Sequence, residues 1–154
     1  MGLTLEFYLG NQKNIRSAFR NLQFDRLYND PKLVSRIADL SLHIQPQDLN
    51  LLSREFGRHS GQKLSDLRPN LKVLVDEPDY GLLLVSKKWI DYAANVSVDA
   101  LDQIVSGWFQ SMKQEYPKEE IEETEEAKRA VRDLLGLCRE AKIKKAAVLH
   151  GWFS

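Results

Sequence analysis

Residues 118–154 read KEEIEETEEAKRAVRDLLGLCREAKIKKAAVLHGWFS, and the rest of the fold is most easily built outward from them. From Ala127 onward, apolar side chains recur every three or four positions, which places them on one face of a helix. Glutamates crowd the start of the stretch and lysines its end, as the helix dipole favours. We therefore expect one long helix from Lys118, followed by a buried strand over the apolar run Ala146–Phe153.

The composition is that of one globular domain covering residues 1–154. Of its residues, 43% are hydrophobic and 29% are charged, and Lys plus Arg (22) balances Asp plus Glu (22). This balance gives no overall attraction to nucleic acid or to anionic lipid. A single cysteine cannot form an internal disulfide, and no apolar run approaches the length of a membrane span. We expect a cytoplasmic protein without a membrane segment or signal peptide.

Upstream of this stretch, apolar periodicity predicts alternating helices and strands. The expected strands cover residues 3–9, 40–44, 71–75 and 81–85, and the last two form a hairpin around a Pro- and Asp-containing turn. The expected helices cover residues 15–22, 31–38, 46–56, 87–94 and 98–116, with Ser86 available to cap the fourth. The fold class is thus α+β or α/β, with a small mixed sheet packed by five to six helices.

No residue pattern of recognised chemistry stands out. Cys138 lies on the apolar stripe of the last helix, so we expect it to be buried. His43, His59 and His150 lack metal-ligand spacing, and the glycines at 57 and 61 do not have the spacing of a phosphate-binding loop. The sequence therefore predicts no catalytic residue, no metal site and no cofactor.

The most promising binding residues surround the hairpin turn. Asp76, Glu77, Asp79 and Tyr80 form an acidic tip with an aromatic side chain, which suits docking to a basic partner. Tyr92 lies off the apolar stripe of its helix and is a candidate exposed anchor. The acidic run Glu119–Glu126 offers a second negative surface.

Arg58 and His59 belong to a locally basic stretch, residues 54–72, which suits an anion or an acidic partner. This stretch supports one alternative function, weak nucleic-acid binding, whose affinity would fall with salt. The other alternative is a small enzyme with a site between the acidic turn 76–80 and either His59 or His150.

The end of the chain, with Arg139-Glu140-Ala141-Lys142 on a helix before an apolar strand, is similar to that of the barstar family of bacterial nuclease inhibitors. No segment here matches the one with which those inhibitors block their enzyme. The leading hypothesis is a non-enzymatic protein-binding or regulatory module, in the manner of an inhibitor or immunity protein. Its expected partner is another protein, and the chain itself is expected to be a monomer or a weak homodimer.

Overall fold

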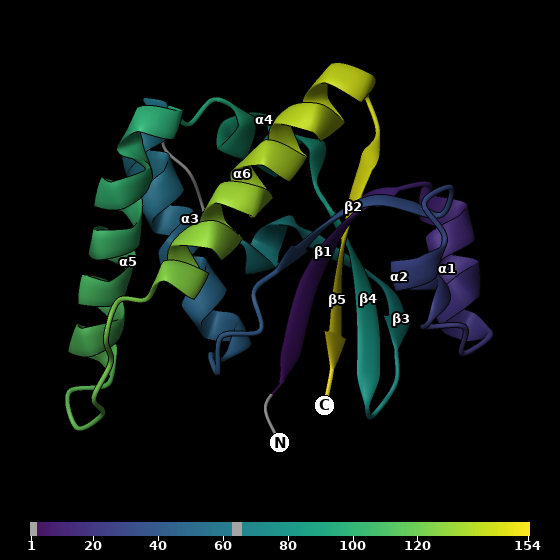
Figure 1. Cartoon of the computed structure of the whole chain (residues 1–154), viewed down its shortest axis with the longest axis horizontal. Coiled ribbons are helices and arrows are strands. Elements are labelled where there is room, and N and C mark those ends of the chain that lie inside the picture. Colours follow the sequence, from purple (N-terminus) through teal and green to yellow (C-terminus); the bar gives the residue numbers. More distant parts are fainter. Residues whose placement is uncertain (1–2, 63–65) are drawn as a thin grey trace.

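An antiparallel sheet of five strands forms the middle of the molecule (Figure 1). The computed structural model describes residues 3–62 and 66–154. The strand order is β2-β1-β5-β4-β3, and every described pairing is antiparallel. The strands are β1 (Thr4–Gly10), β2 (Val34–Asp39), β3 (Leu71–Asp76), β4 (Tyr80–Val85) and β5 (Ala147–Phe153). The α+β class is therefore confirmed in a single compact domain, whereas the mixture of parallel and antiparallel pairs is wrong.

Helices cover both faces of this sheet. Figure 1 places α3, α4, α5 and α6 on one side and α1 and α2 on the other. Their bounds are α1 Gln12–Arg20, α2 Arg26–Asn29, α3 Pro46–Ser60, α4 Lys87–Ala94, α5 Leu101–Glu115 and α6 Glu125–Lys144. Short 3-10 turns at Arg68–Asn70 and Val98–Ala100 precede β3 and α5. No helix in the described ranges is long and apolar enough to cross a bilayer.

The inner strands of the sheet, β1, β5 and β4, separate two apolar cores. Along β1, Leu5, Phe7 and Leu9 face the larger core beneath α3–α6, whereas Tyr8 faces the smaller core beneath α1. Successive strand residues point to opposite faces, so a strand in the middle of a two-sided sheet is buried throughout. β5 fits this rule, because Val148 faces the larger core and Leu149 faces the smaller one.

The segment between α2 and α3 differs from the prediction. The expected helix over residues 31–38 is wrong, because Val34–Asp39 is the edge strand β2 paired with β1. Asp30 does not cap a helix here, since its side chain accepts a hydrogen bond from the Lys32 amide within a turn. The expected strand over residues 40–44 is also wrong, because this segment connects β2 to α3. Pairing with β1 overrides an apolar spacing that suits either structure.

The start of the last helix also differs. Residues 117–124 are not helical, and α6 begins at Glu125, with the Thr124 hydroxyl accepting the Ala127 amide as N-cap. Repulsion between neighbouring glutamates disfavours packing them into one helical turn, and a threonine cap offers a defined start downstream. The acidic run is therefore mostly an interhelical linker. The helix crosses β2, where Arg36 lies 3.6 Å from Glu140.

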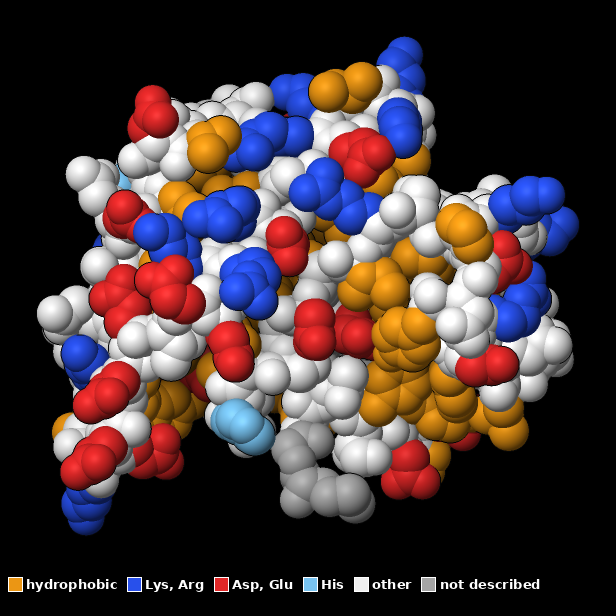
Figure 2. Space-filling model, in the orientation of Figure 1, with side chains coloured by type: hydrophobic (Ala, Val, Ile, Leu, Met, Phe, Trp, Pro, Cys, Tyr) orange, Lys and Arg blue, Asp and Glu red, His pale blue; other side chains and the backbone are white. Residues whose placement is uncertain are grey.

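Most other elements follow the prediction. The hairpin β3–β4, the helices α1, α4 and α5 and the terminal strand β5 are all present. Helix α3 continues past Gly57 and ends at Gly61, which adopts a left-handed φ of 73°. Charge is distributed unevenly over this framework. In Figure 2, red acidic side chains gather on the left around the α5–α6 linker, and blue basic side chains gather at the top around the end of α6.

Candidate functional site

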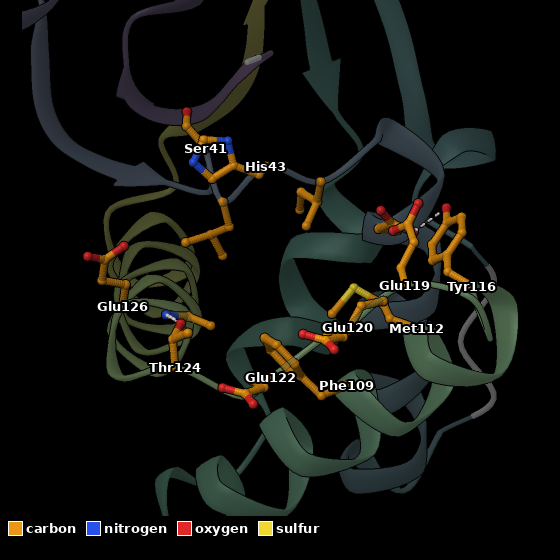
Figure 3. Close-up of a pocket in the computed structure, with 15 residues that line it drawn as sticks. Ser41, His43, Phe109, Met112, Tyr116, Glu119, Glu120, Glu122, Thr124 and Glu126 are labelled. Carbon is orange, nitrogen blue, oxygen red and sulfur yellow. Dashed lines mark hydrogen bonds between the residues drawn. The ribbon is translucent and has the colours of Figure 1, made fainter. Parts of the chain in front are cut away.

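A cavity of about 320 Å³ opens between three segments that are distant in sequence (Figure 3). One wall is the β2–α3 connector, residues 41–44, and another is the end of α5. The third wall is the acidic linker, residues 116–124, together with the first turn of α6. Pockets of this size hold small ligands or single side chains of a partner. Its size therefore makes the cavity a candidate for a functional site.

The floor of the cavity is apolar. Phe109 and Met112 project from α5 into its centre (Figure 3). Leu42, Ile44 and Ile121 complete the apolar lining from the connector and the linker. A methionine and an aromatic ring form an adaptable surface for the methylene groups of a ligand. The floor thus favours a ligand with a hydrocarbon portion.

The rim is strongly acidic. Glu119, Glu120, Glu122 and Glu126 line it, all of them exposed. In Figure 3, Glu126 of α6 lies on one side of the cavity and Glu119 and Glu120 lie on the other. No lysine or arginine is among the described lining residues, and none of these four carboxylates forms an ion pair with a described residue. The rim therefore carries uncompensated negative charge around an apolar floor.

A fifth carboxylate, Asp48, is occupied by hydrogen bonds that stabilise the cavity wall. It is 3% exposed, and its Oδ2 accepts the Gln45 amide at 2.9 Å as part of the α3 capping box. Its Oδ1 accepts the Tyr116 hydroxyl at 2.8 Å. Burial, followed by this hydrogen bond, raises the pKa of Tyr116, so the phenol remains a donor. Asp48 thus ties the end of α5 to the start of α3.

The connector wall is held in place by the sheet. The Ser41 hydroxyl accepts the amide of Leu5 in β1 at 3.0 Å. Two residues later, His43 adopts a left-handed φ of 59° and lies exposed at the rim. No hydrogen bond links Ser41 to His43 among the described contacts, so these two residues do not form a nucleophile–base pair. Nor does the described part of the chain contain a cluster suited to a metal ion.

The acidic hairpin tip is separate from the cavity. Asp76, Glu77 and Asp79 are exposed at the β3–β4 turn, whereas the cavity lies by the α5–α6 linker. Tyr80 is only half-exposed, because its ring packs edge-on against Phe24 with centroids 5.1 Å apart. The structure therefore presents the carboxylates of the tip to solvent and makes Tyr80 part of an aromatic cluster.

The remaining predicted binding residues also lie outside the cavity. Arg58 and His59 occupy the last turn of α3, where Arg58 forms an ion pair with buried Glu55 and His59 is half-buried. Tyr92 of α4 is half-buried, with the Lys88 ammonium 5.8 Å from its ring centroid. These positions do not combine into a single site.

The basic stretch 54–72 is partly neutralised. Arg54 donates two hydrogen bonds to Asp66, at 2.8 and 3.1 Å. Lys63 lies outside the described residues. With Arg54 and Arg58 both paired to carboxylates, the stretch presents less positive charge than its sequence indicates. This pairing weakens the case for a nucleic-acid surface there.

Two titratable groups of the core, His150 and Cys138, are structural. His150 is 3% exposed, stacks on Phe7 with centroids 4.4 Å apart, and donates from Nδ1 to the Glu6 carbonyl at 2.9 Å. Burial lowers its pKa to about 4, so the imidazole is neutral at physiological pH. Cys138 is fully buried, as predicted, and burial raises its pKa to about 12. Neither group is accessible to a substrate.

The fold and the cavity together define an α+β domain with an acidic cavity over an apolar floor. No family model matches the sequence, and neither the curated proteins nor the solved structures contain a significant match to it. The acidic run 119–126 was recognisable from sequence as a negative surface, whereas Phe109, Met112 and His43 were not recognisable as parts of the same site. Only the packing of α5 and the connector against the linker brings them together.

Proposed function

We propose that this protein is a non-enzymatic binding module that recognises a basic segment of another protein at the acidic cavity. One observation carries the proposal: the cavity is lined by Asp48 and four rim glutamates, and its described lining holds no lysine or arginine. Uncompensated charge of one sign around a concave surface attracts and orients a partner of the opposite sign.

The apolar floor suits a lysine or arginine side chain in particular. Both side chains carry a hydrocarbon stem that packs on apolar surface while the charged head remains at the rim. Phe109 and Met112 would contact the stem, and the glutamates from both sides of the cavity would contact the head. A simple hydrated metal ion would gain nothing from such a floor.

The alternatives receive less support from the same contacts. An acidic rim repels phosphate, so the cavity does not suit nucleic acid. An enzyme needs a nucleophile or a general base with a partner that orients it, and neither His150 nor Cys138 is accessible.

The test compares two variants with equal loss of charge. The cavity variant replaces Glu119, Glu120, Glu122 and Glu126 with Gln, and the control variant carries Asp76→Asn, Glu77→Gln, Asp79→Asn and Asp99→Asn at exposed positions elsewhere. The probe is the acetylated and amidated peptide Lys-Leu-Lys-Leu-Lys, titrated by calorimetry at low salt. We expect the cavity variant to bind at least tenfold more weakly than the parent and the control variant to stay within about twofold.

Equal weakening in the two variants would mean that only net charge matters, and the proposal would fail. Loss confined to the control variant would transfer the site to the hairpin tip. Thermal melts of both variants establish that binding and not folding has changed.

A further inference from the structure

Glu6 is a buried carboxylate that lacks a cationic partner. It points from β1 toward α1 and α2 and is 5% exposed. Its Oε1 accepts hydrogen bonds from the hydroxyls of Tyr8 at 2.7 Å and Tyr28 at 2.6 Å. Burial, together with the charge of Glu6, raises the pKa of both tyrosines, so both remain donors. This geometry fixes Oε1 firmly.

The second oxygen of Glu6, Oε2, accepts no hydrogen bond from a described residue. No described lysine or arginine forms an ion pair with Glu6 either. Among the described side chains, Arg16 Nε is the only atom that is both buried from solvent and without a hydrogen-bond partner. Oε2 of Glu6 also has no hydrogen-bond partner but is not in this class, so it retains contact with solvent. A buried carboxylate with one open oxygen is poised to accept a hydrogen bond from outside the chain.

A second carboxylate stands beside it. Asp39 is directly opposite Glu6 in the β1–β2 pair, and cross-strand partners point to the same face of a sheet. Like charges at such a pair are unfavourable unless a cation lies between them. One Asp39 oxygen accepts the Ser41 amide at 3.0 Å, and Asp39 is otherwise exposed. β2 is an edge strand, so no described strand pairs with its outer side.

The carboxylates border an exposed apolar surface. Tyr28 is 54% exposed and Leu22 is 62% exposed, with Leu22 held at a left-handed φ of 57° after α1. Phe24 and Ile37 are partly buried and pack against the smaller core on this side of the sheet. Figure 2 shows orange side chains gathered over the right half of this face, near α1 and α2, with red side chains along their left border. Contiguous apolar surface with a polar rim is typical of protein interfaces.

We propose that this face is a second protein-binding surface, whose partner inserts an arginine between the Tyr28 ring and the Glu6–Asp39 pair. Charge complementarity indicates which side chain the partner inserts, because two carboxylates and one half-exposed aromatic ring suit a flat cation. A guanidinium donates two parallel hydrogen bonds to carboxylate oxygens and stacks on an aromatic face, which an ammonium does not do as well. Leu22 and Phe24 supply the apolar surround.

Most of this surface lies apart from the acidic cavity. The cavity is lined by the connector 41–44, α5, the α5–α6 linker and the start of α6, whereas Glu6 and Tyr28 face α1 and α2 on the opposite side of the sheet. The two meet where Asp39 accepts the amide of Ser41. The test is therefore made in the cavity variant that lacks Glu119, Glu120, Glu122 and Glu126. Because this variant already lacks the rim glutamates, absence of arginine binding at Glu6 would not count against the proposed function of the cavity. Absence of peptide binding at the cavity would likewise not change the result measured at Glu6.

The probes are the acetylated and amidated peptides Phe-Arg-Leu, Phe-citrulline-Leu and Phe-Lys-Leu, titrated into ¹⁵N-labelled protein. Citrulline keeps the shape of arginine but carries no charge. We expect the arginine peptide to shift the amide signals of Tyr28 and Glu6 and to bind at least fivefold more tightly than the other two. Glu6→Gln and Asp39→Asn should each abolish this preference, whereas Asp99→Asn on a remote exposed turn should leave it intact.

Equal binding of the arginine and citrulline peptides, or a flat titration, would overturn the proposal. Shifts confined to residues away from α2 and β1 would do the same. Tyr28→Phe tests the ring without its hydroxyl, because it removes one of the two hydrogen bonds to Oε1 of Glu6 and keeps the aromatic face. We expect this variant to retain a preference for arginine. Should Glu6→Gln fail to fold, Asp39→Asn at an exposed position still decides the question.

Discussion

Gly10 shows how closely two backbones approach where β1 ends. A methyl group at this position would overlap the backbone carbonyl oxygen of Leu33 and lie 2.9 Å from Cδ1 of Ile15. The register of the β1–β2 pair also shifts at this point. Backbone atoms cannot rotate aside as a side chain can, so the position requires glycine.

We expect Gly10→Ala to lower the free energy of unfolding by about 1–3 kcal/mol, the usual cost of overpacking. Gly136→Ala is the matched control, because its added methyl group meets only the guanidinium of half-exposed Arg36. Alanine also favours the helix, so this control should be neutral or up to about 1 kcal/mol more stable. Urea denaturation of both variants measures the difference, and equal effects would contradict the explanation.

His150 should make stability depend on pH. Its pKa falls from 6.5 in the unfolded chain to about 4 in the folded protein, so between these values the unfolded state binds more protons. Stability contributed by the neutral imidazole is present above pH 6.5 and is lost as pH falls toward 4, by roughly 3 kcal/mol. His150→Gln should flatten the decline in unfolding free energy between pH 7 and 4.5. A slope unchanged by this substitution would assign the decline to carboxylates.

Side-chain burial could be predicted only in part. The helical spacing around Cys138 correctly predicted that it is buried. The alternation of apolar and polar residues over 3–9 is typical of a half-buried strand with Glu6 on its polar side. Glu6 is nevertheless buried, because α1 and α2 cover that face as well. A period of two reveals which residues share a face, but it does not reveal how many faces are covered.

At the scale of elements, the sequence predicted correctly those helices that have a capping residue directly before their first turn. Ser86 accepts the Trp89 amide and Gln45 forms a capping box with Asp48, and both helices begin as expected. The segment 31–38 was assigned wrongly because Leu33, Val34 and Ile37 fit a helical spacing equally well. Its strand structure depends on pairing with β1, more than 20 residues away. That information is absent from the segment itself.

The cap of α6 offers a direct test at this scale. Thr124 accepts the Ala127 amide at 3.1 Å and marks the boundary between the acidic linker and the helix. We expect Thr124→Ala to cost about 1 kcal/mol of stability, while Thr124→Ser, which keeps the hydroxyl, should cost little. Thermal denaturation of the two variants measures this difference. Equal melting temperatures for Ala and Ser would show that the hydroxyl contributes nothing to the boundary.

For the whole molecule, the candidate surfaces arise from contacts between distant segments. The cavity needs the connector 41–44, the end of α5 and the acidic linker together. The Glu6 surface needs β1, α2 and the edge strand β2. Sequence alone revealed the acidic run as a negative surface, because glutamates can be counted locally. The apolar floor and the unpaired buried carboxylate could not be seen, since both are properties of the assembled sheet and its helices.

The position of β5 makes the fold depend on residues at the far end of the chain. β5 lies between β1 and β4, and its pairs include Leu5 with Trp152 and Leu83 with His150. Without residues 147–154, β1 and β4 each lose one of their two partner strands, and both apolar cores open to solvent. We expect this truncation to abolish cooperative unfolding, as measured by thermal circular dichroism. Removing only Ser154, which donates its amide to the Asp79 carbonyl, should leave the melt almost unchanged. A truncated chain that still melts cooperatively would show that β1 and β4 can form a stable sheet without β5.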